Sequence, residues 1–253
     1  MKHLLLVSLL AIVGFSVSAH AQAGLVMLGV GGPAGPPTTN LKVWYRGDSL
    51  TCTGGCSGTN VVTALVDKSA NGNNCTTSGG PTYLASGPPH FPGITFASGS
   101  SQYCAMGTPV AWNGTTNGIT LFVIAADANI SSSQGFMGCS IGCFNLNFTN
   151  TGYVRAAIIG IATLGTETTP TTNGVYHLWT VVYNSSTGVL SFWRDGVSDG
   201  GATDATTVTS ALAWIARTNV YGSVGFSELL VYDTNLDGTT ISAINTAIMS
   251  GSY

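Results

Sequence analysis

The chain has 253 residues, of which 44% are hydrophobic and only 7% charged, and its formal net charge at pH 7 is −3. The hydrophobic share is large enough to fill a core, which excludes the common type of intrinsically disordered protein. Seven Lys and Arg residues give no basic surface that would attract phosphates, so we expect neither nucleic acid nor an anionic membrane surface as a partner. The length suits one large β domain or two small ones.

The N-terminus has the order of a secretory signal peptide. A short basic start is followed by the almost wholly apolar residues 4–17 and then by small residues at an A-x-A spacing. The apolar run is shorter than the roughly 20 residues that a membrane-spanning helix needs. We therefore predict a signal peptide over residues 1–21, cleaved after Ala21 or Ala23. The mature protein is then expected to be secreted or held at the cell surface, with no membrane insertion after cleavage.

The six cysteines of an exported chain predict disulfides. Two pairs have a C-x3-C spacing and can each close a short loop, which leaves the remaining two to pair with one another. The alternative is a zinc site built from the two C-x3-C pairs, which an oxidising compartment and the absence of nearby His disfavour. The predicted disulfides are Cys52–Cys56, Cys75–Cys104 and Cys139–Cys143.

After a Gly- and Pro-rich segment over residues 22–40, predicted to be a linker, the chain consists of short β patterns. The eight apolar residues 119–126 predict a strand buried on both faces. Residues 144–148 (FNLNF) alternate apolar and polar side chains, which predicts a half-buried strand. Residues 176–183 and 189–194 both have strand patterns, and the five residues between them, 184–188, end in Gly, which predicts a hairpin. The other strands are predicted at 41–45, 61–66, 93–96, 102–106, 153–161 and 224–232.

The end of the chain has the periodicity of a helix. Ile241, Ile244 and Ile248 fall at i, i+3 and i+7, and Asp237 or Thr239 is a candidate N-cap. Many short strands with Gly, Asn and Ser turns and a single terminal helix indicate a β-sandwich or barrel over residues 41–253.

Six segments, in this order along the chain, together resemble a known family. The chain is similar to the laminin-G-like jelly-roll domains of the concanavalin A-like lectin/glucanase superfamily. The segments are 44–50 (WYRGDSL), 66–74 (VDKSANGNN), 92–96 (PGITF), 177–183 (HLWTVVY), 190–197 (LSFWRDGV) and 225–236 (GFSELLVYDTNL).

This resemblance implies an all-β, two-sheet antiparallel jelly-roll sandwich with a short C-terminal helix. It also implies that the strands of Cys75 and Cys104 are neighbours. Members with this fold include sugar-binding lectins, protein-binding modules, adhesion domains and glycoside hydrolases, so the site residues must decide the function.

Catalytic residues are hard to find in this sequence. Glycosidases need two carboxylates at one bond, and the catalytic members that resemble laminarinases place them as E-x-D-x-E. Glu167 lies in a Thr-rich segment with no acid two residues away, and Glu228 has its nearest acid, Asp233, on the opposite face of a strand. In the resembling family a Glu at this position is structural. His90 and His177 accompany no nucleophile elbow of the G-x-S-x-G type, so they do not indicate a hydrolytic triad. For His177 we expect a hydrogen bond to the backbone or to a Tyr. We therefore predict no enzymatic activity.

Calcium is the candidate cofactor. Relatives of this fold often bind one Ca²⁺ at the sandwich rim, through an Asp at a strand end and an Asn or Asp from a neighbouring strand. The resemblance therefore implies Asp127 as a metal ligand, with Asn145 or Asn147 as a second one. The alternative for Asp127 is a solvated turn carboxylate.

Sugar binding needs exposed aromatic rings with hydrogen-bonding neighbours. Trp112, in a Gly/Asn/Thr loop, and Trp214 are the candidate platforms, supported by Tyr103, Tyr153 and Arg217. The tryptophans within predicted strands are expected in the core, namely Trp44, Trp179 and Trp193.

The leading hypothesis is an exported, non-catalytic binding module for a glycan or another cell-surface ligand. A structural or adhesion protein with no small-ligand site is the alternative, and a glycoside hydrolase is the third class. Exposure of Trp112 and Trp214 on one face would favour the binding module, whereas burial of both would favour the structural role. A hydrolase would require Glu228 to face a cleft beside a second acid.

Overall fold

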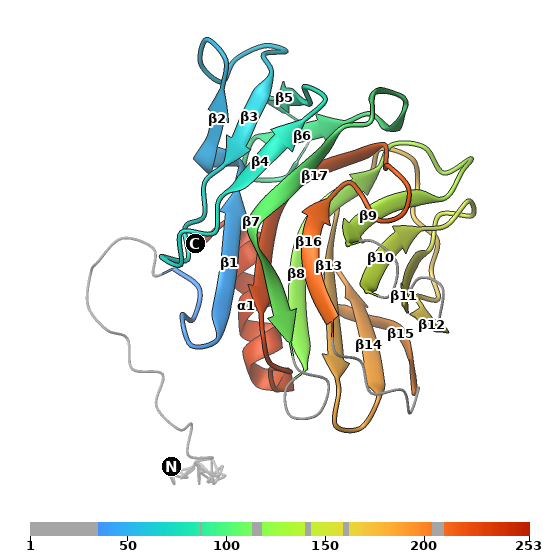
Figure 1. Cartoon of the computed structure of the whole chain (residues 1–253). Helices are drawn as coiled ribbons and strands as arrows, with labels where there is room; N and C mark the ends of the chain where they lie inside the picture. The colour runs from blue at the N-terminus through green and yellow to red at the C-terminus, as the bar shows by residue number, and fades with distance from the viewer. Residues whose placement is uncertain (1–34, 87, 113–117, 140–142, 159–161, 204–209) are drawn as a thin grey trace, which may run out of the picture. The chain divides into compact units, whose positions relative to one another are not determined.

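The computed structural model describes residues 35–86, 88–112, 118–139, 143–158, 162–203 and 210–253 (Figure 1). The predicted signal peptide and residues 22–34 of the predicted linker lie outside the described residues. The first strand begins at Leu41, where the sequence predicts it.

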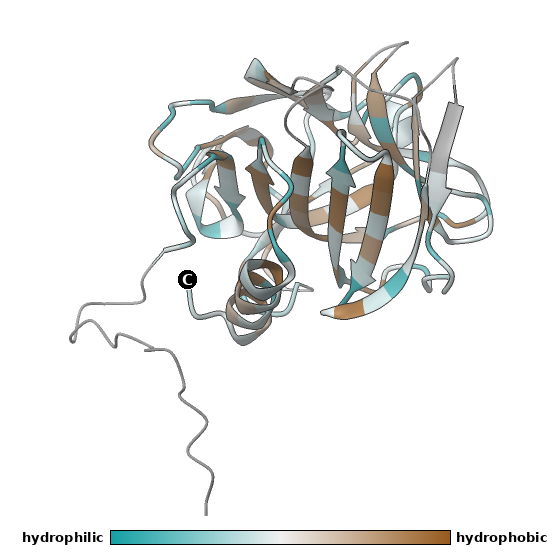
Figure 2. Cartoon of the chain, turned by 90° about the horizontal axis from the view of Figure 1, so that it is seen from below, coloured by the Kyte–Doolittle hydropathy of each residue, from teal (hydrophilic) through white to brown (hydrophobic). Residues whose placement is uncertain are grey.

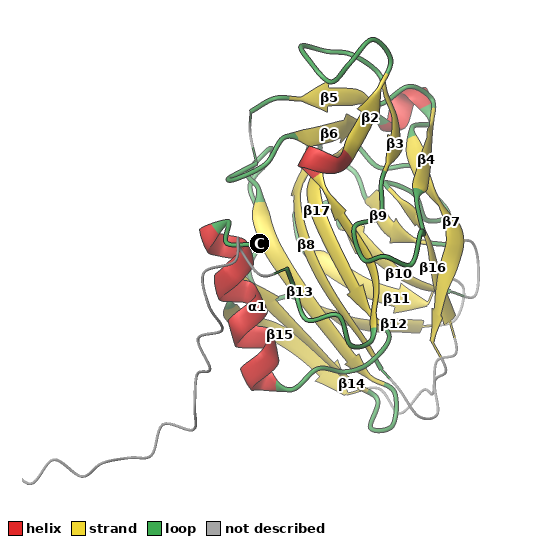
Figure 3. Cartoon of the chain, turned by 90° about the vertical axis from the view of Figure 1, so that its left-hand side faces the viewer, coloured by secondary structure: helices red, strands yellow, loops and turns green. Residues whose placement is uncertain are grey.

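Two antiparallel sheets pack face to face (Figure 3). Within the described residues, sheet A has eight strands in the order β15-β14-β13-β8-β17-β6-β5, with β1 also pairing with β17. Sheet B has nine described strands in the order β12-β11-β10-β9-β16-β7-β4-β3-β2. Sheet A comprises β1 (Leu41–Arg46), β5 (Thr82–Leu84), β6 (Gly93–Phe96), β8 (Ile119–Asp127), β13 (His177–Asn184), β14 (Val189–Arg194), β15 (Val197–Thr203) and β17 (Val224–Tyr232).

The strands of sheet B come largely from the middle of the chain. They are β2 (Leu50–Cys52), β3 (Val62–Leu65), β4 (Cys75–Ser78), β7 (Tyr103–Trp112), β9 (Gln134–Gly138), β10 (Phe144–Phe148), β11 (Val154–Ile158), β12 (Ala162–Thr166) and β16 (Ser210–Ile215). Two 3-10 turns, Gly47–Ser49 and Ser98–Ser100, and the C-terminal helix α1 (Gly238–Ser250) complete the described elements. This architecture confirms the predicted all-β two-sheet sandwich with a C-terminal helix.

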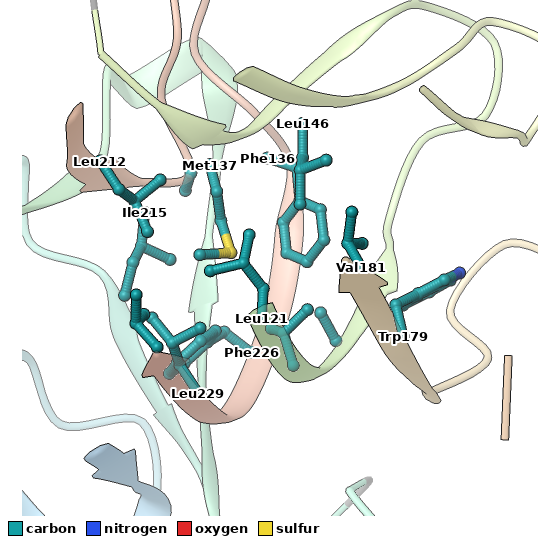
Figure 4. Packing of buried hydrophobic residues seen from close by; sticks show 14 of the residues in the cluster. Leu121, Phe136, Met137, Leu146, Trp179, Val181, Leu212, Ile215, Phe226 and Leu229 are labelled. Carbon is teal, nitrogen blue, oxygen red and sulfur yellow. The ribbon is translucent and has the colours of Figure 1, made fainter. Parts of the chain in front are cut away.

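The main core fills the space between the two sheets. Phe136 and Phe148 of sheet B stack with ring centroids 4.7 Å apart, and Trp179 of sheet A meets their rings edge-on at 6.0 and 5.2 Å. In Figure 4, Phe136 from sheet B and Val181 from sheet A point into the same interior. Fully burying an aromatic or large aliphatic side chain stabilises the fold by about 1.5–3 kcal/mol. This layer therefore supplies most of the driving force for closing the sandwich.

Strand β8 is buried on both faces, as predicted from its apolar run. Leu121 lies in the main core, while Phe122 and Ile124 face the other way into a second cluster beneath α1. The helix contributes its isoleucines, among them Ile244, to that cluster, and it lies against the outer face of sheet A (Figure 2). Asp237 is the N-cap, because its side chain accepts the N–H groups of residues 239 and 240 at 2.9 Å.

The six cysteines form the three predicted disulfides, Cys52–Cys56, Cys75–Cys104 and Cys139–Cys143. Cys75 and Cys104 are fully buried on the paired strands β4 and β7. The bonds agree with the disulfide interpretation rather than with a zinc site, and they are compatible with an extracellular protein. Among the described residues, no helix combines the length and apolarity needed to cross a membrane.

The Cys75–Cys104 bond is predicted to be the most stabilising of the three. Its loop is much longer than the others, and the loss of chain entropy in the unfolded state grows with loop length. Replacing both cysteines with Ala should lower the free energy of unfolding by roughly 3–4 kcal/mol, against roughly 2 kcal/mol for the Cys52–Cys56 pair. Urea unfolding of the oxidised proteins measures both values, and equal losses would contradict the loop-length explanation.

Candidate functional site

The outer face of sheet B collects the predicted sugar-binding side chains. In β7, Cys104 and Met106 belong to the core, so the alternate residues Tyr103 and Ala105 project outward. Trp214 of β16 pairs directly with Ala105 and therefore lies on the same outer face. The aromatic side chains Tyr103 and Trp214 on this face are half-buried.

Four of these side chains form one group, which we call the aromatic–arginine cluster: Tyr103, Trp214, Arg217 and Tyr221. The Arg217 guanidinium lies 4.1 Å from the Trp214 ring centroid, 4.6 Å from that of Tyr103 and 5.2 Å from that of Tyr221. The Tyr103 ring is 6.5 Å from the Trp214 ring and 5.9 Å from the Tyr221 ring. Each cation–π contact at a partly exposed position contributes about 0.5–1 kcal/mol, so the rings hold the cation in place.

A short hairpin over residues 217–221 positions this cluster. Arg217 and Tyr221 pair across it, and the Thr218 N–H donates to the Val220 carbonyl at 2.9 Å. The hairpin rests directly on β9, since a Cβ added to Gly135 would come within 2.1 Å of the Val220 carbonyl oxygen. Glycine at position 135 is thus what lets the hairpin approach the sheet.

The structure brings together three of the predicted sugar-binding residues, Tyr103, Trp214 and Arg217, with Tyr221, which the sequence analysis did not include. The available signal was its position four residues after Arg217 across a turn. Trp112 ends β7, where its backbone pairs with Ser210, and its side chain lies outside what the structure describes. Its predicted role stays a prediction.

The other predicted aromatic positions are spread over the molecule. Tyr153 is half-buried just before β11, and its N–H donates to the Thr149 hydroxyl at 3.0 Å. Trp179 is fully buried, as expected. Trp44 and Trp193 are only half-buried and pack against the cluster beneath α1.

Strand β10 was predicted to be half-buried, and that prediction was wrong. Its polar residues Asn145 and Asn147 are buried as well as its apolar ones. Asn145 accepts the Cys139 N–H at 3.1 Å and donates to the Cys143 carbonyl at 2.6 Å. Asn147 accepts a hydrogen bond from the Thr218 hydroxyl at 3.1 Å. Segments from elsewhere in the chain therefore cover the outer side of this strand.

A polar row runs beside the hairpin across β10, β11 and β12, which lie next to one another (Figure 1). Asn147 pairs with Arg155, and Arg155 pairs with Thr166, so the three residues share the outer face. The Asn147 Nδ2 and the Arg155 Nε are both buried and have no hydrogen-bond partner among the described residues. Unsatisfied buried donors are uncommon in folded proteins, so this row is part of the candidate site.

Asp127, the predicted calcium ligand, is completely buried at the end of β8. Its Oδ1 accepts the Asn129 N–H at 2.9 Å, while its Oδ2 is buried without a hydrogen-bond partner. Burial raises the pKa of Asp127 to about 6. A solvated turn carboxylate is therefore excluded.

Among the described residues, no hydrogen bond connects Asp127 to its predicted co-ligands, Asn145 and Asn147. Asn145 and Asn147 belong to the other sheet and bond elsewhere. Within the described ranges, no three His, Cys, Asp or Glu side chains group closely enough to hold a metal ion. Calcium binding remains a prediction that rests on Asp127.

Glu167 is not a loop residue but the centre of a buried network. Its side chain accepts the Val154 N–H at 2.8 Å and the Trp179 Nε1–H at 3.0 Å. Arg194 lies 2.8 Å from the carboxylate and 3.1 Å from Asp199. Burial is the largest influence on the pKa of Glu167 and raises it despite these donors. The carboxylate links the two sheets.

Glu228 is also buried, with 1% of its surface exposed, and its Oε1 accepts the Trp44 Nε1–H at 3.0 Å. Burial raises the pKa of Glu228 to about 7. The nearby Asp48 bonds to Arg46 and Lys68. The carboxyl groups of Glu167 and Glu228 are thus both buried and hydrogen-bonded to a tryptophan.

The two histidines in the described residues, His90 and His177, lie on the α1 side of the molecule. His177 Nδ1 lies 2.7 Å from Asp195 Oδ2, so the predicted backbone or Tyr partner was wrong. His90 Nε2 lies 2.6 Å from the Met249 carbonyl. A hollow of about 460 Å³ lined by Ile124, Tyr176, His177 and Met249 lies there, away from the aromatic–arginine cluster. Of its lining residues, His177 and Asp195 are already paired with one another.

Comparison with known proteins gives a fold but no family. No family model matches the sequence, and no curated protein matches it. Domain 4 of AbnA, a GH43 extracellular arabinanase from Geobacillus stearothermophilus in complex with arabinotriose, is similar in structure with a TM-score of 0.58 and 11% identity, covering 81% of this chain and 98% of that domain. The binding domain of Paraclostridial Mosquitocidal Protein 1 gives a TM-score of 0.58 at 8% identity, covering 83% of this chain and 52% of that chain.

A mutant of Trypanosoma rangeli sialidase that displays trans-sialidase activity gives a TM-score of 0.55 at 13% identity, over 85% of this chain. This chain spans 34% of the sialidase chain, about a third of its length. At such low identities these likenesses show a shared β-sandwich, jelly-roll-like fold.

The raised pKa of Glu228 predicts a pH dependence of stability. Between the unfolded value of 4.5 and about 7, the folded state keeps a proton that the unfolded state has released. The free energy of unfolding should therefore fall as the pH rises through this window, by on the order of 2–3 kcal/mol, and level off above it. Glu228→Gln can still accept the Trp44 N–H, so it should be as stable as the wild type at pH 4 and more stable at pH 8.

Thermal or urea unfolding across pH 4–8 measures this effect. Asp127→Asn is the matched control, because it should remove only the smaller fall that ends near pH 6. An unchanged pH slope in Glu228→Gln would contradict the structural role assigned to this carboxyl group.

Proposed function

We propose that this chain is an exported, non-catalytic carbohydrate-binding module of the concanavalin A-like, laminin-G-like type. Its ligand would lie on the outer face of sheet B, over the aromatic–arginine cluster. The observation that supports this most is the convergence of Tyr103, Trp214, Arg217 and Tyr221 on one half-exposed patch. Aromatic rings offer apolar contact area at low entropic cost, and the Arg217 fork offers hydrogen-bond donors for hydroxyl groups.

The proteins with similar structures support a carbohydrate as the ligand class. One is an arabinanase domain in complex with arabinotriose, another is a sialidase, and a third is a binding domain. The arabinanase domain is covered over 98% of its length, so the likeness extends over that entire unit. Shared fold alone does not transfer function, and the cluster is what gives the carbohydrate assignment a site.

The non-catalytic assignment is supported by the bonding of the two glutamates. Glu167 is bonded to Trp179 and paired with Arg194, and Glu228 is bonded to Trp44. Each carboxyl group is buried and held by the fold, so neither is placed to protonate or attack a glycosidic bond from an open cleft. Export is supported by the predicted signal peptide and the disulfides.

A purely structural or adhesion role is the second candidate. It is favoured by the stacking of Arg217 on Trp214, which covers one face of the indole. In that case the cluster would only fasten the hairpin 217–221 to sheet B. Binding measurements separate the two candidates, because fastening alone requires no ligand.

The test is a glycan-array screen of the mature, oxidised protein, with calcium and with chelator. Trp214→Ala should weaken binding at least tenfold, which corresponds to about 1.4 kcal/mol, because it removes the largest ring of the cluster. Trp193→Ala is the matched control, since this half-buried tryptophan lies on sheet A. It should keep binding. Sensitivity to chelator would support calcium at Asp127.

Two results would overturn the proposal. One is a stably folded wild type that binds no glycan on the array. The other is an equal loss of binding in Trp214→Ala and Trp193→Ala, which would trace the effect to general destabilisation rather than to the cluster.

A further inference from the structure

Two arginines on the outer face of sheet B have no carboxylate partner. Among the described residues, every other Lys or Arg lies within ion-pair distance of an Asp or Glu. Those pairs are Lys42–Asp233, Arg46–Asp48, Lys68–Asp48, Arg194–Glu167 and Arg194–Asp199. Among the described residues neither Arg217 nor Arg155 makes an ion pair, and the Arg217 guanidinium lies over three aromatic rings. The uncompensated positive charge of the described chain is thus concentrated on one face.

Arg155 also lies beside a second unsatisfied donor. Asn147 is its direct neighbour across β10 and β11, and only 4% of the surface of Asn147 is exposed. The Asn147 Oδ1 is used by Thr218, but its Nδ2 has no acceptor, and neither has the Arg155 Nε. Both groups are N–H donors, so they cannot satisfy each other. An acceptor with two oxygen atoms would satisfy both, and carboxylate or sulfate fits the planar fork of Arg.

The fold keeps the nearest acidic side chain away from this pair. Thr166 lies beside Arg155 on the outer face, and the next residue, Glu167, turns its carboxylate into the interior toward Trp179. The interior pairing of Glu167 thus leaves Arg155 without an internal anion.

From these observations we infer that the carbohydrate bound at this face is acidic. Its carboxylate or sulfate group is accepted by Arg155 and Asn147, and Arg217 adds a second positive charge at the aromatic–arginine cluster. This inference rests on the proposed function and specifies its substrate class. Two arginines in a chain of net charge −3 are too few for a polyphosphate, which favours an anionic group on single sugar residues.

The test uses sets of related oligosaccharides with and without an anionic group. The probes are lactose, sialyllactose and sulfated lactose, together with tri-galacturonate and its methyl ester, titrated against the mature, oxidised protein. The wild type should bind at least one acidic member tenfold or more tightly than its neutral counterpart. That preference should shrink as the salt concentration rises, and the carboxylated and sulfated arms identify which anion is preferred.

Arg155→Met should lower the affinity for the acidic sugar more than the affinity for the neutral one, so that the acidic preference shrinks to what Arg217 provides. Lys42→Met is the matched control, because Lys42 pairs with Asp233 at the edge of sheet A. It should keep the acidic preference.

Asn147→Asp provides a second variant that does not depend on removing a buried side chain. It places a carboxylate beside Arg155, so it should abolish the acidic preference while unfolding at the same or a higher temperature. An unchanged acidic preference in this variant would overturn the inference.

The outcomes separate this inference from the proposed function. If neutral and acidic sugars bind equally and Arg155→Met changes nothing, the inference fails while the carbohydrate-binding proposal stands. If Trp214→Ala leaves binding intact but Arg155→Met removes it, the acidic site stands without the aromatic platform. If no probe and no array glycan binds, both proposals fail.

Discussion

The arrangement of this protein depends on how a single buried carboxylate is satisfied. Burying an ionised carboxylate is costly unless every oxygen finds a partner, and Glu167 meets that condition only when both sheets are in place. Its donors are Val154 in sheet B and Trp179 in sheet A, and its ion pair is with Arg194. Arg155 follows Val154 directly, so the same bond that closes the sandwich also fixes where the outer face places its arginine. The bonds of Glu167 in the interior therefore also determine the position of Arg155 in the candidate site.

Much of the fold could be predicted because local patterns decide it. The apolar run of β8 requires cover on both faces, and the structure provides the core on one side and α1 on the other. The three isoleucines of α1 and the cap at Asp237 are likewise local signals. Cysteine spacing predicted the disulfides for a similar reason, since two of the pairs close short loops. In each case the interacting residues are near one another in sequence or repeat with a fixed period.

The candidate site could be predicted only in part, because it depends on distant segments. The burial of Asn145 and Asn147 follows from the hairpin and from residues Cys139 and Cys143, which no periodicity in β10 reveals. His177 pairs with Asp195 because a neighbouring strand ends beside it. That Arg155 lacks a partner depends on where all the carboxylates lie, so no local pattern could have indicated it.

Over β9 the hairpin 217–221 meets the sheet through its main chain, with the Val220 carbonyl seated over Gly135. A main-chain contact of this kind does not depend on which side chains the hairpin carries. Evolution can therefore alter the residues at its tip and edges, and with them the ligand, without disturbing the core. This freedom requires glycine at two positions, because a Cβ added to Gly135 would come within 2.1 Å of the Val220 carbonyl oxygen and one added to Gly222 within 2.0 Å of the Gly135 carbonyl oxygen. Sheet B thus supports a hairpin whose side chains can be exchanged, which also makes this face suited to directed evolution of new specificities.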